Sequence, residues 1–438
     1  MDIEKPSKRK LSMNPELSIF SKTRVNSGIQ QVKWVDCDPV NPITQDGDCE
    51  IILPGAGIGY IDFLRTFLYV TFKIVKADGT NLTSADKVAP INMILHTMWS
   101  QFDIEFQQKM ISTAGTNYAY LSLFKSILKF GSNTKLSKLQ SALYYKDESS
   151  GISASNPDPS KSDLSAVRNS GLHARYKICK ESNLVDVMGV PLADIFDLQK
   201  YVLNGVNVKI KLAQSKNAFR LMTNHSTEQY KLILKQVSIR ACKVFLAPET
   251  IKAHNETLLE NPSIYPYMQE IIKTYNVSSG SYSLKIDDMF QGSGPSKLVC
   301  GLIKSEAYSG SYGLNPLELQ SCSIDMITCY IDGQSLPFNS IHCNFSAGNY
   351  QEAYYALVDA VNSEGTDITR EDFPKGYSVF VFNLDGHLQC NNPFPALRKA
   401  NVTLEIKFSV ALPWAATLIC YATFPREIHI DKARAVLT

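Results

Sequence analysis

The chain has 438 residues, a formal net charge of +2, 44% hydrophobic residues and 20% charged residues. This length is too great for one ordinary core and predicts two or three domains, each large enough to fold without disulfides or metal ions. The balanced charge argues against a protein that binds nucleic acid over its whole surface, and no run of 18 apolar residues predicts a membrane-spanning helix.

The first 20 residues are polar and basic, and we predict a flexible N-terminal arm. Its basic cluster is Lys5, Lys8, Arg9 and Lys10. We interpret this cluster as a solvated tail, a nuclear import signal or, through Lys8, Arg9 and Lys10, a weak contact to packaged nucleic acid. A secretory signal is not expected, because the basic start lacks an apolar stretch. The ten cysteines form no C-x-x-C pair, which predicts reduced thiols in a cytosolic or nuclear setting.

The first half of the chain reads mainly as β-strands. Over residues 67–76, Leu68, Val70, Phe72 and Ile74 occupy alternate positions, the pattern of a strand with one buried face. The other predicted strands are 49–53, a hairpin over 102–111 with its bend at 107–109, 206–212, and one bent strand or a strand pair over 232–246.

Residues 118–130 break the strand pattern, because their apolar side chains recur at helical spacing. The apolar positions are Tyr120, Leu121, Phe124, Ile127 and Leu128. We predict a helix here, with Asn117 as its N-cap and Gly131 as its stop.

Two further segments predict connections. Residues 147–171 are rich in Ser, Asp, Asn, Pro and Gly, which predicts a long functional or mobile loop. Residues 248–259 predict a helix that begins at Pro248 and ends before Pro262. We expect 147–171 and 248–262 to face outward or to contact neighbouring subunits.

The second half repeats the order of the first. It has predicted strands at 271–277, 297–303, 324–331, 377–384, 402–410 and 417–430, with a helix at 350–361. Asp332-Gly333 is a strong hairpin-turn signal. Each half therefore contains a hairpin, a helix, a strand and a long strand in the same order. The segment Asn207-Val-Lys-Ile-Lys-Leu212 resembles Asn401-Val-Thr-Leu-Glu-Ile-Lys-Phe408.

These elements predict an all-β fold with a few helices. Helices follow only some strands, which argues against a parallel βαβ sheet, and about eight strands in each half favour a closed double-sheet arrangement. We therefore predict two tandem eight-stranded antiparallel jelly rolls. The predicted domains are a basic arm over 1–20, a first jelly roll over 21–247, a linker helix over 248–262 and a second jelly roll over 263–438.

Motifs for catalysis or for cofactor binding do not emerge from the sequence. Gly55-Ala-Gly57-Ile-Gly59 has Tyr60 where a dinucleotide fingerprint needs its third glycine, so we predict a glycine turn. The histidines are His96, His173, His225, His254, His342, His387 and His429. Their wide spacing does not match a metal-binding motif. We predict no catalytic residue, no cofactor and no metal site.

Four other groups are candidate sites. Asp46, Asp48 and Glu50 could bind Ca²⁺ but favour an acidic turn, and Asp367, Glu371 and Asp372 favour a solvated loop. His387 and Cys390 could form a thiol–imidazole pair but lie in a predicted loop. Tyr144, Tyr145, Tyr308 and Tyr312 are either surface anchors or ordinary packing at strand ends.

The chain resembles the capsid-type proteins of Maverick/Polinton elements and related adintoviruses over nearly its whole length. The resemblance runs through Pro15-Glu-Leu-Ser-Ile-Phe20, Pro54-Gly-Ala-Gly57, Phe67-Leu-Tyr-Val70, Pro90-Ile-Asn-Met-Ile-Leu-His96, Phe130-Gly-Ser-Asn133, Tyr201-Val-Leu-Asn204, Val208-Lys-Ile-Lys-Leu212, Ser215-Lys216, Tyr330-Ile-Asp-Gly-Gln334, Ala411-Leu-Pro413, Tyr421-Ala422 and Ile430-Asp431. The order and spacing of these segments carry the resemblance together.

This resemblance implies a double jelly-roll major capsid protein without enzymatic activity. Such proteins form trimers of pseudo-hexagonal outline that tile an icosahedral shell around double-stranded DNA, beside a single jelly-roll penton protein. The implied location is the virion, with assembly in the host cytoplasm or nucleus. The alternatives are a minor or vertex capsid protein, a tandem jelly-roll module that binds glycans, and an enzyme of cupin or hydrolase type.

Overall fold

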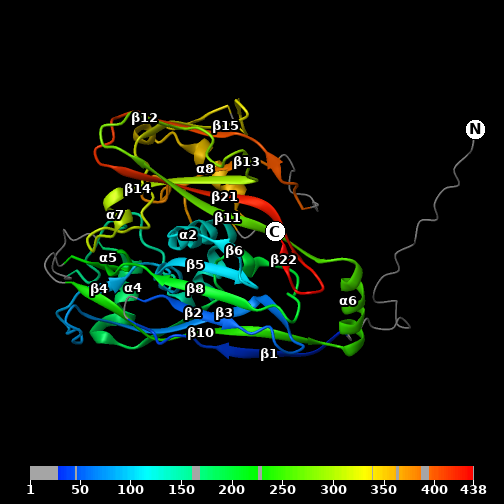
Figure 1. Ribbon diagram of the computed structural model, residues 1–438. Coiled ribbons are helices and arrows are strands. Elements are labelled where there is room, and N and C mark those ends of the chain that lie inside the picture. Colours follow the sequence, from blue (N-terminus) through cyan, green and yellow to red (C-terminus); the bar gives the residue numbers. More distant parts are fainter. Residues whose placement is uncertain are drawn as a thin grey trace, which may run out of the picture.

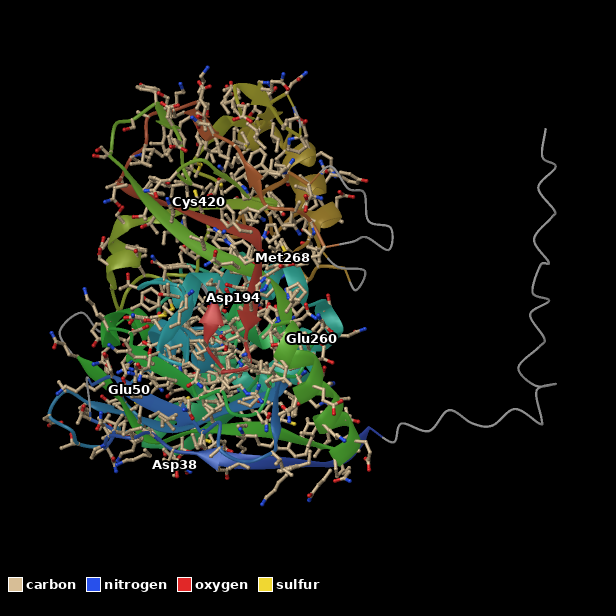
Figure 2. All side chains as sticks on the ribbon, turned by 45° about the vertical axis from the view of Figure 1, so that its right-hand side comes forward. Asp38, Glu50, Asp194, Glu260, Met268 and Cys420 are labelled. Atoms are coloured by element: carbon tan, nitrogen blue, oxygen red, sulfur yellow. The ribbon has the colours of Figure 1, made fainter. Side chains whose placement is uncertain are left out.

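The computed structural model describes residues 28–44, 47–159, 168–224, 229–337, 339–361, 365–385 and 394–437. Figure 1 shows two β-sandwiches stacked on one another, with helix α2 (Tyr118–Lys129) between them. The strands at residues 29–246 form what we call the first sandwich, and those at residues 263–437 form the second sandwich. Figure 2 places Asp194 and Met268 where the two sandwiches meet.

The first sandwich consists of two antiparallel sheets whose main paths each hold four strands. One sheet has the order β1 (Ile29–Cys37), β10 (Tyr230–Leu246), β3 (Tyr60–Lys76) and β7 (Val185–Gly189). The other has the order β2 (Cys49–Leu53), β8 (Val208–Gln214), β5 (Trp99–Phe106) and β6 (Lys109–Thr113). A small pair, β4 (Val88–Pro90) and β9 (Leu221–Thr223), lies beside them.

The eight main strands of the second sandwich repeat this order. Its first sheet has the order β11 (Ser263–Val277), β21 (Ala416–Ile430), β14 (Lys297–Lys304) and β18 (Phe380–Asn383), and β22 (Val436–Leu437) pairs with β21. Its second sheet has the order β12 (Ser283–Ile286), β20 (Val402–Phe408), β15 (Ile324–Ile331) and β16 (Gln334–Ser335), and β17 (Ile341–His342) pairs with β15. A small pair, β13 (Ser293–Gly294) and β19 (Arg398–Lys399), completes it.

The matching strand orders confirm the predicted pair of eight-stranded antiparallel jelly rolls. In each half the chain visits the eight positions in the same sequence, crossing between the two sheets as a jelly roll does. The predicted long strand over 232–246 is one bent strand, because the register of β10 shifts between Leu234 and Gln236 and between Arg240 and Cys242. The proposed domain boundaries themselves stay a prediction.

The helices fill the connections between strands. They are α1 (Ile94–Thr97), α2, α3 (Ser132–Leu136), α4 (Ser170–Cys179), α5 (Asn217–Arg220), α6 (Pro248–Glu260), α7 (Ser305–Ser309) and α8 (Gln351–Ala360). Within the part of the chain that the structure describes, no helix has both the length and the apolar character needed to cross a bilayer. The predicted helices at 118–130, 248–259 and 350–361 are confirmed as α2, α6 and α8.

The predicted ends of α2 are partly wrong. The helix begins directly after Asn117, but the Asn117 side chain makes no capping bond and instead accepts a hydrogen bond from the Tyr308 hydroxyl at 2.8 Å. The helix ends at Lys129, and Gly131 has a negative φ of −78° and is the N-cap of α3. Gly131 is therefore not a left-handed stop.

The segment 147–171 is shorter as a loop than predicted. Its last two residues begin α4, whose first turn is capped because the Asn169 side chain accepts a hydrogen bond from the Leu172 amide at 3.1 Å. Near its start, Ile152 is buried and its carbonyl accepts a hydrogen bond from Asn315 of the second sandwich at 3.2 Å. Residues 160–167 lie outside the described residues.

The glycine turn predicted before β3 is a point of close backbone approach. A Cβ atom at Gly55 would lie 2.5 Å from the carbonyl carbon and oxygen of Val206. The Gly55 amide donates a hydrogen bond to the Asn207 side chain at 2.9 Å, and its carbonyl accepts one from the Gly205 amide at 2.8 Å. The residue is a glycine because any side chain would push β2 away from β8.

We predict that Gly55→Ala destabilises the protein by roughly 1–3 kcal/mol, the usual cost of overpacking a rigid site. Gly313→Ala is the matched control, because a Cβ atom there would meet nothing within 4 Å. Its expected change is within about 0.5 kcal/mol. Denaturant unfolding of the two variants would test this, and equal stabilities would contradict the prediction.

Candidate functional site

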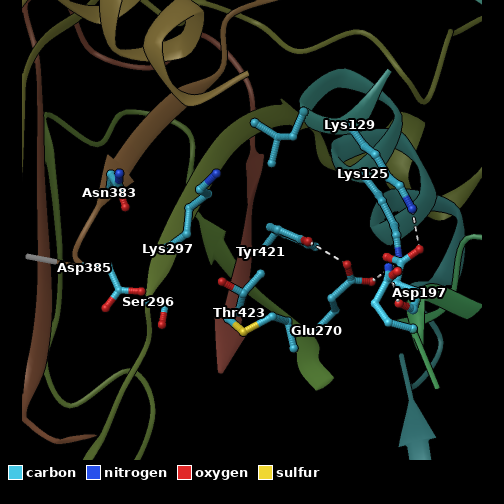
Figure 3. A pocket seen from close by; sticks show the side chains of 13 residues that line it. Lys125, Lys129, Asp197, Glu270, Ser296, Lys297, Asn383, Asp385, Tyr421 and Thr423 are labelled. Carbon is cyan, nitrogen blue, oxygen red and sulfur yellow. Dashed lines mark hydrogen bonds and ion pairs between the residues drawn. The ribbon is translucent and has the colours of Figure 1, made fainter. Parts of the chain in front are cut away.

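A cluster of charged side chains lies between the two sandwiches (Figure 3). Lys125 on α2 is 3% exposed, and its Nζ lies 2.8 Å from Asp197 Oδ2 and 3.0 Å from Glu270 Oε2. Glu270 lies on β11, and its Oε1 accepts a hydrogen bond from the Tyr421 hydroxyl on β21 at 2.9 Å. We call Lys125, Asp197, Glu270 and Tyr421 the inter-sandwich cluster.

Neighbouring elements fix the geometry of this cluster. Asp197 ends a short 3-10 turn that begins at Asp194, and the Asp194 carboxylate accepts a hydrogen bond from the Glu270 amide at 3.3 Å. Lys129, one turn along α2 from Lys125, forms a second ion pair with Asp197. The cluster therefore joins α2 and the 3-10 turn of the first sandwich to two strands of the second.

Burial and charge shift the pKa values of the cluster in opposite directions. Burial raises the pKa of Glu270 to about 7, although Lys125 opposes this shift. Burial also raises the pKa of the Asp194 carboxyl. Burial alone would lower the pKa of Lys125, but the attraction of Glu270 and Asp197 outweighs it and raises that pKa. The pKa of Asp197 is lowered, since Lys125 and Lys129 overcome its desolvation.

A cleft of about 420 Å³ opens beside the cluster and is lined by Lys125, Asp197, Glu270, Lys297 and Tyr421 among others. A carboxyl with a pKa near neutrality in a cleft is a common feature of acid–base sites. Here both Glu270 oxygens are already bound, one by Lys125 and one by Tyr421. The Lys297 amine likewise donates to the Ala360 carbonyl at 3.2 Å. These partners make the cluster a contact between the sandwiches.

One feature of the sequence points to this cluster: a lysine within the apolar stripe of the predicted helix. Lys125 lies four residues after Leu121 and Leu128 lies seven residues after it, so all three are on the same stripe of α2. All residues of α2 from Tyr118 to Leu128 are buried. A charged residue within an apolar stripe of a fully enclosed helix needs a partner, but the partners come from distant parts of the chain.

The acidic group at 367–372 is not the solvated loop that was predicted. Asp367 forms an ion pair with buried Lys135 and accepts a hydrogen bond from the Tyr144 hydroxyl at 2.7 Å. Asp372 pairs with Lys146 at 2.7 Å. Glu371 alone is exposed. The prediction was wrong because two of these carboxylates lie in the contact between the sandwiches. A carboxylate that is withdrawn from water there needs a charged partner, and basic side chains of the first sandwich supply it.

Tyrosines also bridge the two sandwiches. The Tyr308 hydroxyl reaches Asn117, the Tyr312 hydroxyl donates to the Tyr230 carbonyl at 2.8 Å, and the Tyr377 hydroxyl donates to the Asp147 carbonyl at 2.6 Å. Tyr144 joins Asp367, whereas Tyr145 is partly buried against the core. Four of these side chains therefore anchor one sandwich to the other, a role that neither earlier interpretation contained.

The remaining sequence candidates do not come together. Glu50 and Asp48 pair across strands with Lys209 and Lys211, and Asp46 lies outside the described residues. Buried His96 contacts the Tyr118 hydroxyl at 3.2 Å, and burial lowers its pKa to about 3. Among the described residues, no three His, Cys, Asp or Glu side chains could hold a metal ion. The basic residues of the arm, His225, His387 and Cys390 also lie outside the described residues.

Comparison with known proteins gives a distant relative. No protein-family model matches the chain. An uncharacterised protein of Caenorhabditis elegans is 24% identical over 423 residues, which cover 93% of this chain and 96% of the relative.

Solved structures similar to this chain come from viruses. A chain of the Sputnik virophage matches with a TM-score of 0.64 at 13% identity, covering 100% of this chain and 93% of that one. The mavirus major capsid protein matches with a TM-score of 0.57 at 11% identity, covering 100% and 95%. The Faustovirus major capsid protein matches with a TM-score of 0.55 at 9% identity, covering 94% and 93%. The chain therefore has the double jelly-roll fold of viral major capsid proteins.

We predict that Lys125→Met lowers the free energy of unfolding by roughly 3–5 kcal/mol, because it leaves two carboxylates in the cluster without their buried partner. Lys129→Met is the matched control, one turn away and 39% exposed. Its expected cost is at most about 1 kcal/mol. Denaturant midpoints measure both, and a larger loss in the Lys129 variant would refute the assignment.

The raised pKa of Glu270 predicts a dependence of stability on pH. The ordinary pKa is 4.5 and the folded one is about 7, so the folded state holds this proton more tightly. Between these values the folded chain binds more protons than the unfolded chain, and stability falls as pH rises. The stability of the unsubstituted chain relative to Glu270→Gln should therefore fall from pH 5 to pH 7.5. A relative stability that rises over this range would contradict the prediction.

Proposed function

We propose that the chain is a structural major capsid protein of a double-stranded DNA virus or of a Maverick/Polinton-type element. The observation that carries this proposal is the repeated strand order of the two sandwiches, together with a likeness to viral major capsid folds that spans nearly the whole of both chains. A minor or vertex capsid protein built on a single jelly roll would need only about half this length.

The duplicated fold supports assembly by threes. A trimer of two-barrel chains presents six similar barrels, so its outline approaches a hexagon, and hexagonal units can tile most of an icosahedral surface. The proposed partners are two further copies of the chain, neighbouring trimers and a single jelly-roll penton protein. The proposed location is the virion, with assembly in the host cytoplasm or nucleus. A weak DNA contact through Lys8, Arg9 and Lys10 stays a prediction.

The chemistry of the cluster supports a structural role over an enzymatic one. The charged groups of the inter-sandwich cluster are bound to one another, and the carboxylate with the most perturbed pKa has no free oxygen. Buried polar networks of this kind fix one arrangement of the elements that supply them. The cluster is suited to hold two barrels in a single orientation.

We predict that the purified chain is a trimer. Light scattering coupled to size-exclusion chromatography should give three times the chain mass of 48.8 kDa, and electron microscopy should show particles of hexagonal outline. A chain that stays monomeric at micromolar concentration would count against the proposal. Specific hits on a glycan array without any assembly would favour the glycan-binding alternative instead.

A further inference from the structure

A hollow along α6 leaves apolar side chains exposed. Of the 13 residues of α6 only Leu258 is buried. One side of the helix borders a hollow of about 530 Å³ that Ile58, Leu246, Ile251 and Leu259 line, with Lys252 and Glu256 at its polar positions. Ile58 is 56% exposed and Leu259 is 67% exposed. We call this hollow the α6 groove. Apolar side chains gathered around a hollow are typical of a binding surface.

The N-terminal segment enters the molecule beside this groove. The Gly28 carbonyl accepts a hydrogen bond from the Ala247 amide at 3.0 Å, directly before α6, and Gln30 lines the groove itself. Figure 1 shows the start of β1 next to α6 at the same end of the first sandwich. The described chain therefore begins beside the groove, at Gly28.

The N-terminal segment contains apolar side chains that match the apolar lining of the groove. Its apolar side chains include Leu17, Ile19 and Phe20, close together and flanked on the C-terminal side by Lys22 and Arg24. An extended chain covers up to about 3.3–3.6 Å per residue. The eight steps from Phe20 to Gly28 can thus span a distance of about 27 Å, whereas α6 with its 13 residues is about 20 Å long. Phe20 can reach any point along the groove of its own chain.

The charges on the two sides are complementary. Residues 1–27 hold six Lys or Arg and three Asp or Glu. The helix exposes Glu249, Glu256 and Glu260 against one basic residue, Lys252. Opposite charges around an apolar contact favour its formation and fix its direction.

We propose that Leu17, Ile19 and Phe20 of the N-terminal segment bind in the α6 groove of the same chain. The short connection to Gly28 makes this contact intramolecular, with an effective concentration that a separate molecule would not match at ordinary protein concentrations. The bound segment would cover Ile58 and Leu259 and place the basic residues Lys5 to Lys10 at the α6 end of the molecule.

The test uses the full-length chain with a photo-reactive phenylalanine analogue in place of Phe20. After irradiation we expect cross-links to Ile58 or to residues 246–259, with the product running at the mass of one chain on a denaturing gel. Leu259→Glu should lower the cross-linking yield at least fivefold. Leu184→Glu is the control, since Leu184 is 64% exposed and is not among the residues that line the groove, and it should leave the yield unchanged.

Three outcomes would overturn the proposal. Cross-links that reach neither Ile58 nor residues 246–259 would show that the segment binds elsewhere. Products at twice the chain mass alone would show that the groove receives a second copy. An unchanged yield in Leu259→Glu would show that the groove is not the binding site. Both variants should stay folded, because neither leucine belongs to the buried core. Their unfolding midpoints check this.

Discussion

Placing α2 between two sandwiches buries a charged side chain, since Lys125 is only 3% exposed. Every residue of this helix from Tyr118 to Leu128 is buried, so its outer face meets the second sandwich where most helices would meet solvent. Lys125 therefore requires carboxylates from the surrounding elements, and Glu270 on β11 and Asp197 supply them. The position of β11 relative to α2, and with it the orientation of the second sandwich, depends on this compensation.

The other contacts between the sandwiches follow the same rule at the edges of this centre. Lys135, Tyr144 and Lys146 of the first sandwich meet Asp367 and Asp372 of the second. The core is continuous across the contact, since one hydrophobic cluster holds buried residues from both sandwiches. A continuous apolar core resists separation of the two halves but does not choose among their orientations. Paired charges and hydroxyls at fixed positions make that choice.

Local patterns in the sequence predicted most of the fold but little of the site. Alternation placed Leu68 and Val70 on a buried face, and Asp332-Gly333 formed the expected turn with φ values of 50° and 82°. Gln107 and Gln108 form the other hairpin bend with positive φ values, although neither is a typical turn residue. The partners of Lys125 lie 72 and 145 positions further along the chain. Asp367 was predicted to lie in a solvated loop because its partner Lys135 is also distant in the sequence. Ion pairs between distant segments follow from tertiary packing, which a local pattern does not contain.

The two sandwiches share the order of their eight main strands, but equivalent elements have different surroundings. Helix α8 follows the β15–β16 hairpin and β17 in the second sandwich, whereas α2 follows the β5–β6 hairpin directly in the first. Only Ala353, Ala356 and Leu357 of α8 are buried, and Tyr355 is 62% exposed. The first helix is enclosed by the second sandwich, whereas its counterpart exposes Tyr355 and Val358 in the single chain. The two barrels therefore present different side chains at equivalent places. The proposed trimer would therefore have six barrels but only threefold symmetry, and the proposed contacts between neighbouring trimers would alternate between two kinds of surface.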